Sequence, residues 1–199
     1  MANAFIPYGI YWSTPFAKWQ GSIAHLNSLQ LAANTGKQAL AARRFPVEKI
    51  DLGILGHTNP QLGSFYGLPY VTGMMGLAGV AGPTVQQACA TSARVLQMAA
   101  AEVSDGSSQC ALLITTDRCS NGPIVYYPDP TAPGGTGHTE RWVLDNFARD
   151  PYARNAMIDT AENVVARLGV STAEQNEVAL ARYVQYLDAL AGERAFQRR

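Results

Sequence analysis

The chain has 199 residues, 47% of them hydrophobic and 15% charged, and its formal net charge at pH 7 is zero. This length can bury the core of a medium-sized domain, and the composition is too apolar for a disordered chain. The neutral charge and the scattered basic residues provide no electrostatic surface for nucleic acid or for an anionic membrane. We therefore expect neither of them as a partner.

The N-terminal sequence and the cysteines bear on the compartment. The segment MANAFIPYGIYW has no basic region and no cleavage site of the kind found in signal peptides. The apolar runs are interrupted well before the ~20 residues that a transmembrane helix needs. The three cysteines are odd in number and sparse, which does not suggest a disulfide framework. From these features we expect a cytoplasmic protein.

Strands and helices are predicted to alternate in the first half of the chain. Short apolar runs predict strands over residues 4–12, 50–56, 83–88 and 110–116. Helical periodicity predicts helices over residues 22–43, 63–79 and 91–106, and Gly106 is placed to end the last of them. Strands that alternate with helices indicate a mostly parallel sheet, and apolar residues on both strand faces indicate helices on both sides. The fold class is therefore α/β.

Residues 52–93 contain no Asp, Glu, Lys or Arg. Surface helices of a monomer usually carry charge, whereas the centres of large interfaces are depleted of it. Because the segment includes a whole predicted helix, we expect it to contribute to a subunit interface as well as to the core. A large core alone is the alternative interpretation.

The character of the sequence changes after Thr116. Residues 117–140 are rich in Pro and Gly and lack periodicity, which predicts a long loop of functional or connecting type. Helices are predicted to follow over residues 141–148, 155–169 and 171–190. Ser171 and Glu174 form a capping-box pattern at the start of the last one.

Several common chemistries have no motif in this sequence. It contains no dinucleotide-binding glycine motif, no phosphate-binding loop, no nucleophile elbow and no Cys-x-x-Cys. His25, His57 and His138 are isolated in the sequence, and we interpret them as ordinary surface or core residues. We expect no metal site.

Cys89 differs from the other cysteines in its predicted position, at the end of a strand and just before a helix. Backbone N–H groups and the positive end of the helix dipole would stabilise a thiolate there. Its neighbours in VQQACATSARV are small, and α/β proteins bind ligands at the carboxyl ends of parallel strands. Cys89 is thus either a nucleophile or a small packing residue. Cys110 is predicted to lie in the core, and Cys119 is open to either interpretation.

Two segments, QACATSA at 87–93 and MIDTAENVVARLGVSTAEQNEVAL at 157–180, resemble the N-terminal half of the thiolase family. The resemblance covers essentially the whole chain. It implies the thiolase-type α-β-α-β-α layered fold, with residues 1–116 as an N-terminal α/β half. Residues 117–199 would be an incomplete loop-domain segment, and the C-terminal half would be absent from this chain.

The resemblance also implies a function. Cys89 would be the nucleophile that accepts an acyl group from acyl-CoA, with its backbone N–H helping to hold the oxyanion. Met157 would line the acyl pocket. The reaction would be thiolytic cleavage of a 3-ketoacyl-CoA or the reverse Claisen condensation, with a coenzyme A thioester as substrate and no further cofactor. The family resemblance implies a homo- or hetero-oligomer.

The thiolase His, second Cys and Asn belong to the C-terminal half of the family fold. We therefore expect that half on a second chain, or lost by cleavage, and the present chain to be inactive without it. Ala156 and Ile158 flank Met157 where many thiolases have His and Gly. These departures motivate an alternative, a non-catalytic thiolase-like subunit that binds acyl-CoA or acts as a scaffold. A condensing enzyme of the ketoacyl-synthase type is the third hypothesis.

Overall fold

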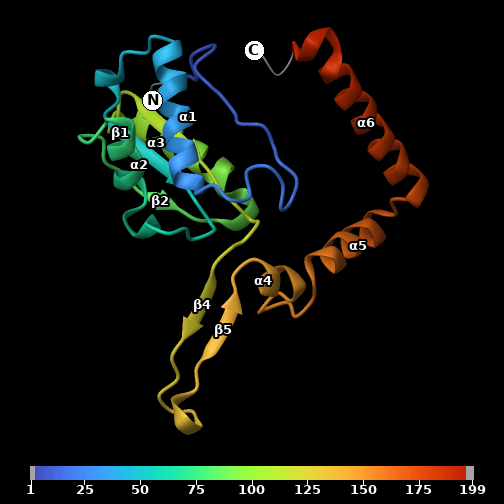
Figure 1. The fold of residues 1–199 in the computed structure, drawn as a ribbon. Helices are drawn as coiled ribbons and strands as arrows, with labels where there is room; N and C mark the ends of the chain where they lie inside the picture. The colour runs from blue at the N-terminus through green and yellow to red at the C-terminus, as the bar shows by residue number, and fades with distance from the viewer. Residues whose placement is uncertain (1–2, 196–199) are drawn as a thin grey trace. The chain divides into compact units, whose positions relative to one another are not determined.

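A computed structural model describes residues 3–195, which belong to two compact units that divide after Val143 (Figure 1). Within residues 3–195, unit 1 contains three α-helices and five β-strands, and unit 2 contains three further α-helices. The thiolase resemblance implies a different boundary, after residue 116, between two parts of the family fold. The division into compact units does not test that boundary, which stays a prediction.

A parallel three-stranded sheet forms the centre of unit 1. Its strands are β1 (Leu52–Gly56), β2 (Thr84–Val85) and β3 (Ala111–Thr115), and they lie in the order β2-β1-β3. All five residues of β1 pair with β3, and only its last two pair with β2. The sequence-based prediction of a parallel sheet is confirmed.

Helices cover both faces of this sheet. One core cluster joins Leu55 of β1 to residues of α1 (Ser28–Ala42) and α2 (Leu68–Met75). A second cluster joins Ile54 of β1 to α3 (Thr91–Asp105). Because successive side chains of a strand point to opposite faces, Ile54 and Leu55 place α3 on one side and the α1–α2 pair on the other. The unit therefore has the α/β/α layers that the apolar strands predicted.

Single capping residues determine where helix α1 begins and where helix α3 ends. The Asn27 side chain accepts hydrogen bonds from the N–H groups of Leu29 and Gln30, at 3.0 and 3.3 Å. This cap starts α1 at Ser28, so the helix predicted from residue 22 is shorter than expected. Gly106 closes α3 in the left-handed conformation, with φ of 87°, as the sequence predicted.

Two features of unit 1 differ from the prediction. Residues 4–12 form no strand, and they pair with none of the described strands. Residues 117–140, predicted to be a loop, contain most of an antiparallel hairpin of β4 (Ile124–Tyr127) and β5 (His138–Arg141). Neither strand, IVYY or HTER, alternates apolar and polar residues, so neither shows the period of two that predicts a strand.

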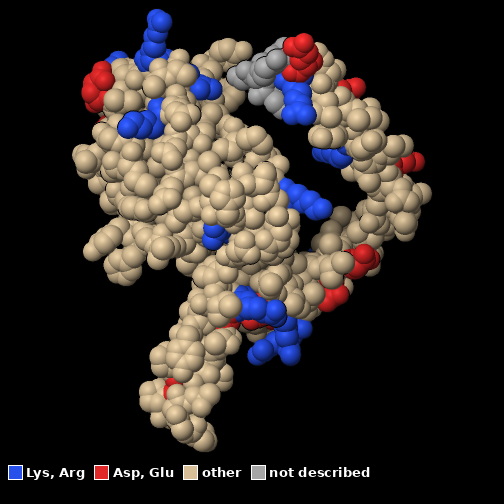
Figure 2. Space-filling model, viewed as in Figure 1, with Lys and Arg blue, Asp and Glu red and all other residues tan. Residues whose placement is uncertain are grey.

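The charge-free segment 52–93 contributes to the core and to the surface. Leu68 and Val71 are fully buried between α1 and β1, whereas Leu62 and Phe65 are 93% and 91% exposed. In the view of Figure 2, the charged side chains of unit 1 lie mainly at its top, and the centre of this face shows few. The core part of the prediction is confirmed, and the interface part stays a prediction.

Unit 2 contains α4 (Leu144–Ala148), α5 (Met157–Leu168) and α6 (Thr172–Arg194). The predicted capping box at the start of α6 is present, because Ser171 Oγ accepts from Glu174 N at 3.2 Å and Glu174 accepts from Ser171 N at 2.7 Å. No described residue of α5 or α6 is buried. None of the helices in residues 3–195 has the length and apolar character needed to cross a membrane.

Replacing Leu55 by alanine is expected to lower the free energy of unfolding by about 2–5 kcal/mol, because the side chain is completely buried in the central strand. Leu62→Ala is the matched control, since that leucine is 93% exposed, and its effect should stay within about 0.5 kcal/mol. Urea unfolding followed by circular dichroism measures both. Equal effects of the two substitutions would contradict the assignment of the core.

Candidate functional site

Cys89 lies at a tight bend between β2 and α3. The bend is a short 3-10 helix, η3 (Ala88–Ala90), and the Cys89 side chain is exposed. The Thr91 hydroxyl accepts a hydrogen bond from Gln87 N at 2.8 Å and donates one to Ala88 O at 2.7 Å. Thr91, the first residue of α3, thus bonds to the two residues before Cys89 and restrains the position of Cys89 in the bend.

The backbone next to Cys89 has an unfavourable conformation. Ala88 has a positive φ of 43°, which an L-residue with a Cβ adopts at a cost of roughly 1–2 kcal/mol. Such residues persist only where the surrounding structure holds them, and they are common at functional sites. The hydrogen bond from Thr91 to Ala88 O supplies this restraint.

A small cavity of about 260 Å³ lies at the carboxyl ends of β1 and β3, and Cys89 lines it. Its lining residues share this end of the sheet or the start of α3: Gly56, Ala88, Cys89, Thr91, Ser92, Thr115, Thr116 and Asp117. Gly56 allows α3 to approach, because a Cβ there would lie 2.8 Å from Thr91 Cγ2. The cavity thus occupies the position where α/β proteins bind ligands.

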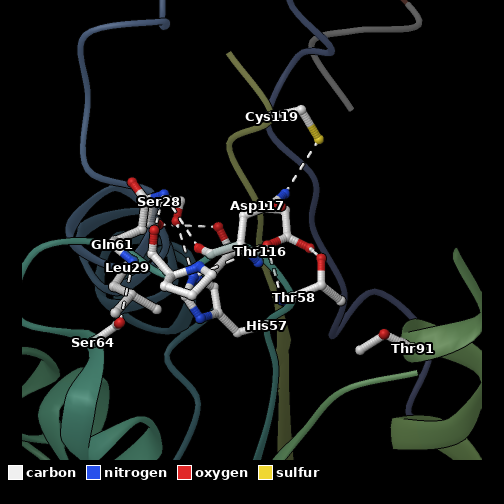
Figure 3. A network of polar contacts seen from close by, with 12 residues as sticks. Ser28, Leu29, His57, Thr58, Gln61, Ser64, Thr91, Thr116, Asp117 and Cys119 are labelled. Carbon is white, nitrogen blue, oxygen red and sulfur yellow. Dashed lines mark hydrogen bonds and ion pairs between the residues drawn. The ribbon is translucent and has the colours of Figure 1, made fainter. Parts of the chain in front are cut away.

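Asp117 connects the segments that follow β1 and β3. Its Oδ1 accepts hydrogen bonds from Thr58 N and Asn59 N at 2.9 and 2.8 Å, and its Oδ2 accepts one from the Thr58 hydroxyl (Figure 3). The Trp142 indole N–H donates to Thr58 O at 3.0 Å and adds a further restraint to this segment. The carboxylate on the cavity wall is therefore held in one orientation.

His57 is a buried neighbour of Asp117. It directly follows β1 and is 8% exposed, with its Nε2 at 3.5 Å from Ser28 Oγ and 4.0 Å from Asp117 Oδ1. Burial lowers the pKa of His57, and the nearby Asp117 carboxylate only partly opposes this effect. His57 is not among the residues that line the Cys89 cavity. His57 is therefore a buried residue, and it is not isolated in space.

The other two cysteines have different surroundings. Cys119 is exposed, and its Sγ accepts a hydrogen bond from Asn59 Nδ2 at 3.3 Å. Cys110 is partly buried directly before β3, and its burial, assisted by the Asp51 carboxylate, raises the pKa of the thiol. Neither lines the cavity beside Cys89. Residues 3–195 contain no group of three or more His, Cys, Asp or Glu side chains suited to a metal ion.

Met157, the second site residue expected from the sequence, is the first residue of α5 in unit 2. Its side chain is 42% exposed. Ala156 precedes the helix, and its N–H donates to the Asp159 carboxylate at 3.0 Å. The role of Met157 in the acyl pocket stays a prediction.

Sequence reasoning missed the Asp117 network, although one signal for it was present. His57 and Asp117 each follow an apolar strand closely, and parallel strands bring their carboxyl ends to one edge. Applied to β1, β2 and β3, this rule places both residues at the same edge of the sheet as Cys89. The hydrogen bonds to Thr58 and Asn59 depend on loop geometry that has no periodic signature.

The state of His57 predicts a pH dependence of stability. Because its pKa is lowered in the folded protein, the unfolded chain binds a proton first as the pH falls below about 6.5. The unfolding free energy should therefore decrease from about pH 6.5 downward, and His57→Gln should reduce this slope. Urea unfolding at a series of pH values measures it. His25→Gln, at an exposed position, is the control, and equal slopes for both variants would contradict the prediction.

Comparison with known proteins identifies the family of the chain. The family model "Thiolase, N-terminal domain" matches residues 12–198, so the chain belongs to the thiolase family. The mitochondrial acetyl-CoA acetyltransferase of Gibberella zeae is 27% identical over 181 residues, covering 85% of this chain and 40% of that protein. The expectation drawn from the two sequence motifs is confirmed.

Solved thiolase structures show the same fold. The acetyl-CoA acetyltransferase of Bacillus anthracis superposes with a TM-score of 0.78 at 22% identity, covering 91% of this chain and 46% of that one. Human mitochondrial 3-ketoacyl-CoA thiolase gives a TM-score of 0.79 at 20% identity, covering 88% and 45%. The chain thus spans less than half the length of these relatives, and it has the fold of their N-terminal half.

Proposed function

We propose that the chain is the nucleophile-bearing half of a thiolase-type acyl-CoA acyltransferase and that Cys89 is the acyl acceptor. The observation that carries this proposal is the position of Cys89, exposed at a restrained bend and on the wall of a cavity at the carboxyl ends of the sheet. Membership of the thiolase family supports it, as do relatives named as acetyl-CoA acetyltransferases.

The first step follows from thioester chemistry. The Cys89 thiolate attacks the thioester carbonyl, the bond from that carbon to the sulfur of coenzyme A breaks, and coenzyme A leaves as its thiolate. The backbone N–H of Cys89 stabilises the oxyanion of the tetrahedral intermediate. The first turn of α3 contributes the positive end of its dipole. Coenzyme A acts here as part of the substrate, and no further cofactor is proposed.

The second step transfers the acyl group from Cys89. In condensation, the carbanion of a second acyl-CoA attacks the Cys89 thioester and releases the thiolate; in the reverse direction, Cys89 attacks the 3-keto carbonyl and displaces that carbanion. Both directions require a group that takes or gives the proton on carbon. The residues that line the cavity include no histidine and no second cysteine. We propose that a C-terminal thiolase half supplies these groups.

The free edge of β3 supports docking of such a half. Cys110 and Thr116 flank β3, and the backbone of each bonds toward β1: Cys110 O accepts from Asp51 N, and Thr116 N donates to Gly56 O. Because the direction of the backbone groups alternates along a strand, Leu112 and Ile114 also face β1. The backbone groups of Ala111, Leu113 and Thr115 consequently point to the other edge, where the described chain places no strand. An edge of this kind pairs readily with an added strand.

A cavity of about 970 Å³ adjoins this edge, between β3 and residues 4–19. Its lining is mostly apolar and includes Ile6, Trp12 and Leu96, and among the described residues only Lys18, Asp117 and Arg118 bring charge to it. The occupant that fits is an uncharged, apolar strand. We propose that the C-terminal half contributes it, and that residues 4–12 are ordered beside it.

A non-catalytic subunit that binds acyl-CoA remains the second candidate. It is favoured by the absence of a histidine or second cysteine from the lining of the Cys89 cavity. In either case we propose an oligomeric assembly and acyl-chain contacts from Met157. The cytoplasmic location also stays a proposal, since one relative is named as mitochondrial.

Purification of the natural assembly distinguishes the two candidates. The enzyme proposal predicts a C-terminal thiolase half in the assembly and coenzyme A-dependent cleavage of acetoacetyl-CoA. Mass spectrometry identifies the polypeptides, and loss of the absorbance of the 3-keto thioester measures the cleavage. An assembly that contains such a half but neither cleaves nor forms the 3-keto thioester would overturn the enzyme proposal in favour of the binding subunit.

A further inference from the structure

We propose that Thr91 is a positioning residue that sets the direction of the Cys89 N–H, an inference that rests on the proposed role of this N–H as an oxyanion donor. Thr91 is the first residue of α3 and is only 6% exposed. Its backbone and its hydroxyl both bond to the segment just before Cys89. Thr91 thus connects the bend that carries the proposed nucleophile to the helix that follows it.

The hydroxyl of Thr91 is fully used within the bend. It accepts a hydrogen bond from Gln87 N at 2.8 Å and donates one to Ala88 O at 2.7 Å. A hydroxyl has a single hydrogen to donate, so this group has none left for a bound acyl group. The part that Thr91 plays is therefore positional and not catalytic.

Ala88 O receives two hydrogen bonds from the same residue, because the Thr91 N–H donates to it as well as the Thr91 hydroxyl. A carbonyl oxygen has two lone pairs, and both are used by these two donors. The Ala88 carbonyl cannot turn without losing both bonds. Thr91 therefore fixes the plane of the peptide group that joins Ala88 to Cys89.

The direction of the Cys89 N–H follows from this plane. A peptide group is planar, and the described chain, residues 3–195, has no cis peptide bond. In a trans peptide the N–H points opposite to the C=O of the same group, so the Cys89 N–H points away from the two donors of Thr91. The direction is set before a substrate binds, as a preorganised oxyanion donor requires.

This restraint opposes a backbone that would otherwise relax. Ala88 has φ of 43°, a conformation in which the Cβ of an L-residue is crowded. Rotation to a negative φ would relieve the crowding and would turn the peptide group that contains the Cys89 N–H. Thr91 is itself held by close packing on the sheet, because its Cγ2 would lie 2.8 Å from a Cβ on Gly56 of β1.

The test compares two reactions of the Cys89 thiolate on the full chain. In acetylation by p-nitrophenyl acetate, the thiolate attacks the ester carbonyl, an oxyanion intermediate forms, and its carbon–oxygen bond breaks to release p-nitrophenolate. In alkylation by iodoacetamide, the thiolate displaces iodide and no oxyanion forms. Peptide mass spectrometry measures both rates at Cys89, and their ratio separates stabilisation of the oxyanion from the reactivity of the thiol.

Thr91→Val keeps the shape of the side chain and removes the hydroxyl, so the ratio of acetylation to alkylation should fall. Complete loss of an oxyanion donor costs about 10²–10³-fold in rate. Because Thr91→Val only releases the direction of the donor, we expect a smaller decrease, of about tenfold. Thr91→Ser retains the hydroxyl, and its ratio should stay within about twofold of the wild type.

Thr72→Val is the matched control for a purely structural effect. Thr72 is 1% exposed, and its hydroxyl also donates to backbone carbonyls, those of Leu68 at 3.2 Å and Val80 at 3.0 Å. It lies on α2, so its replacement should lower stability but leave the ratio at Cys89 unchanged. A ratio that is unchanged in Thr91→Val, or that falls equally in Thr72→Val or in Thr91→Ser, would overturn the proposal.

The ratio reports on the Cys89 N–H whether or not the protein transfers acyl groups from coenzyme A. A lower ratio in Thr91→Val, together with no acyl transfer by the complete assembly, would reject the proposed function and retain the positioning effect. An unchanged ratio, together with normal acyl transfer, would reject only the role of Thr91. The two failures are thus distinguishable.

Discussion

Cys89→Ala is expected to lower acyl transfer by the complete assembly by at least ~10⁴-fold, because removal of a covalent nucleophile eliminates the acyl-enzyme route. The fold should be unaffected. Cys89 is exposed and its neighbours are small, so the unfolding free energy should change by no more than about 0.5 kcal/mol. Steady-state cleavage of acetoacetyl-CoA and urea unfolding measure the two quantities.

Cys119→Ala is the matched control for this prediction. Cys119 is also an exposed thiol of unit 1, but it does not line the cavity that contains Cys89. We expect the variant to retain turnover within a few-fold of the wild type. Turnover that survives in Cys89→Ala, or that is lost equally in both variants, would remove Cys89 from its proposed role.

The second large effect is expected for Gly82→Ala. Gly82 has φ of +150°, and a Cβ at this position would lie 1.9 Å from the carbonyl oxygen of Gly53 in β1. Because this contact is with backbone, it can be relieved only if β1 and the segment leading into β2 separate. The hydrogen bonds from Gly53 N to Ala81 O and from Leu55 N to Pro83 O, on either side of Gly82, would then be strained or broken.

We expect Gly82→Ala to lower the unfolding free energy by about 3 kcal/mol or more. It should also reduce the reactivity of Cys89, because β2 leads directly into the bend that carries this residue. Gly79→Ala is the control, since its Cβ would meet no atom within 4 Å, and its effect should stay within about 0.5 kcal/mol. Similar unfolding midpoints for the two variants in urea would contradict the account of this strand contact.

The sheet and its helices were predictable from the sequence because burial imposes a pattern on them. The runs that became β1 and β3 are apolar on both faces, as expected for strands covered by α1, α2 and α3. The same reasoning placed Cys89 at the junction between a strand and a helix. That position follows from the order of elements and requires no knowledge of side-chain contacts.

The features that could not be predicted depend on partners that are distant in sequence. Residues 4–12 have the apolar content of a strand, but strand formation requires hydrogen bonds to a neighbouring strand, and these residues pair with none of the described strands. The restraint of Asp117 by Thr58 and Asn59 depends on two loops that only the folded sheet brings together. Gln87 and Ala88 adopt a bend that shortens β2 to two residues, and no pattern in VQQACATS indicates it.

The most direct test of the central claim is mass spectrometry of the assembly after incubation with acetyl-CoA and rapid acid quenching. The account predicts that the tryptic peptide containing Cys89 gains the mass of one acetyl group, that peptides containing Cys110 and Cys119 do not, and that added coenzyme A removes the label. An acetyl group found only on another residue, or none on Cys89 in an assembly that turns over substrate, would contradict the assignment of Cys89 as the acyl acceptor.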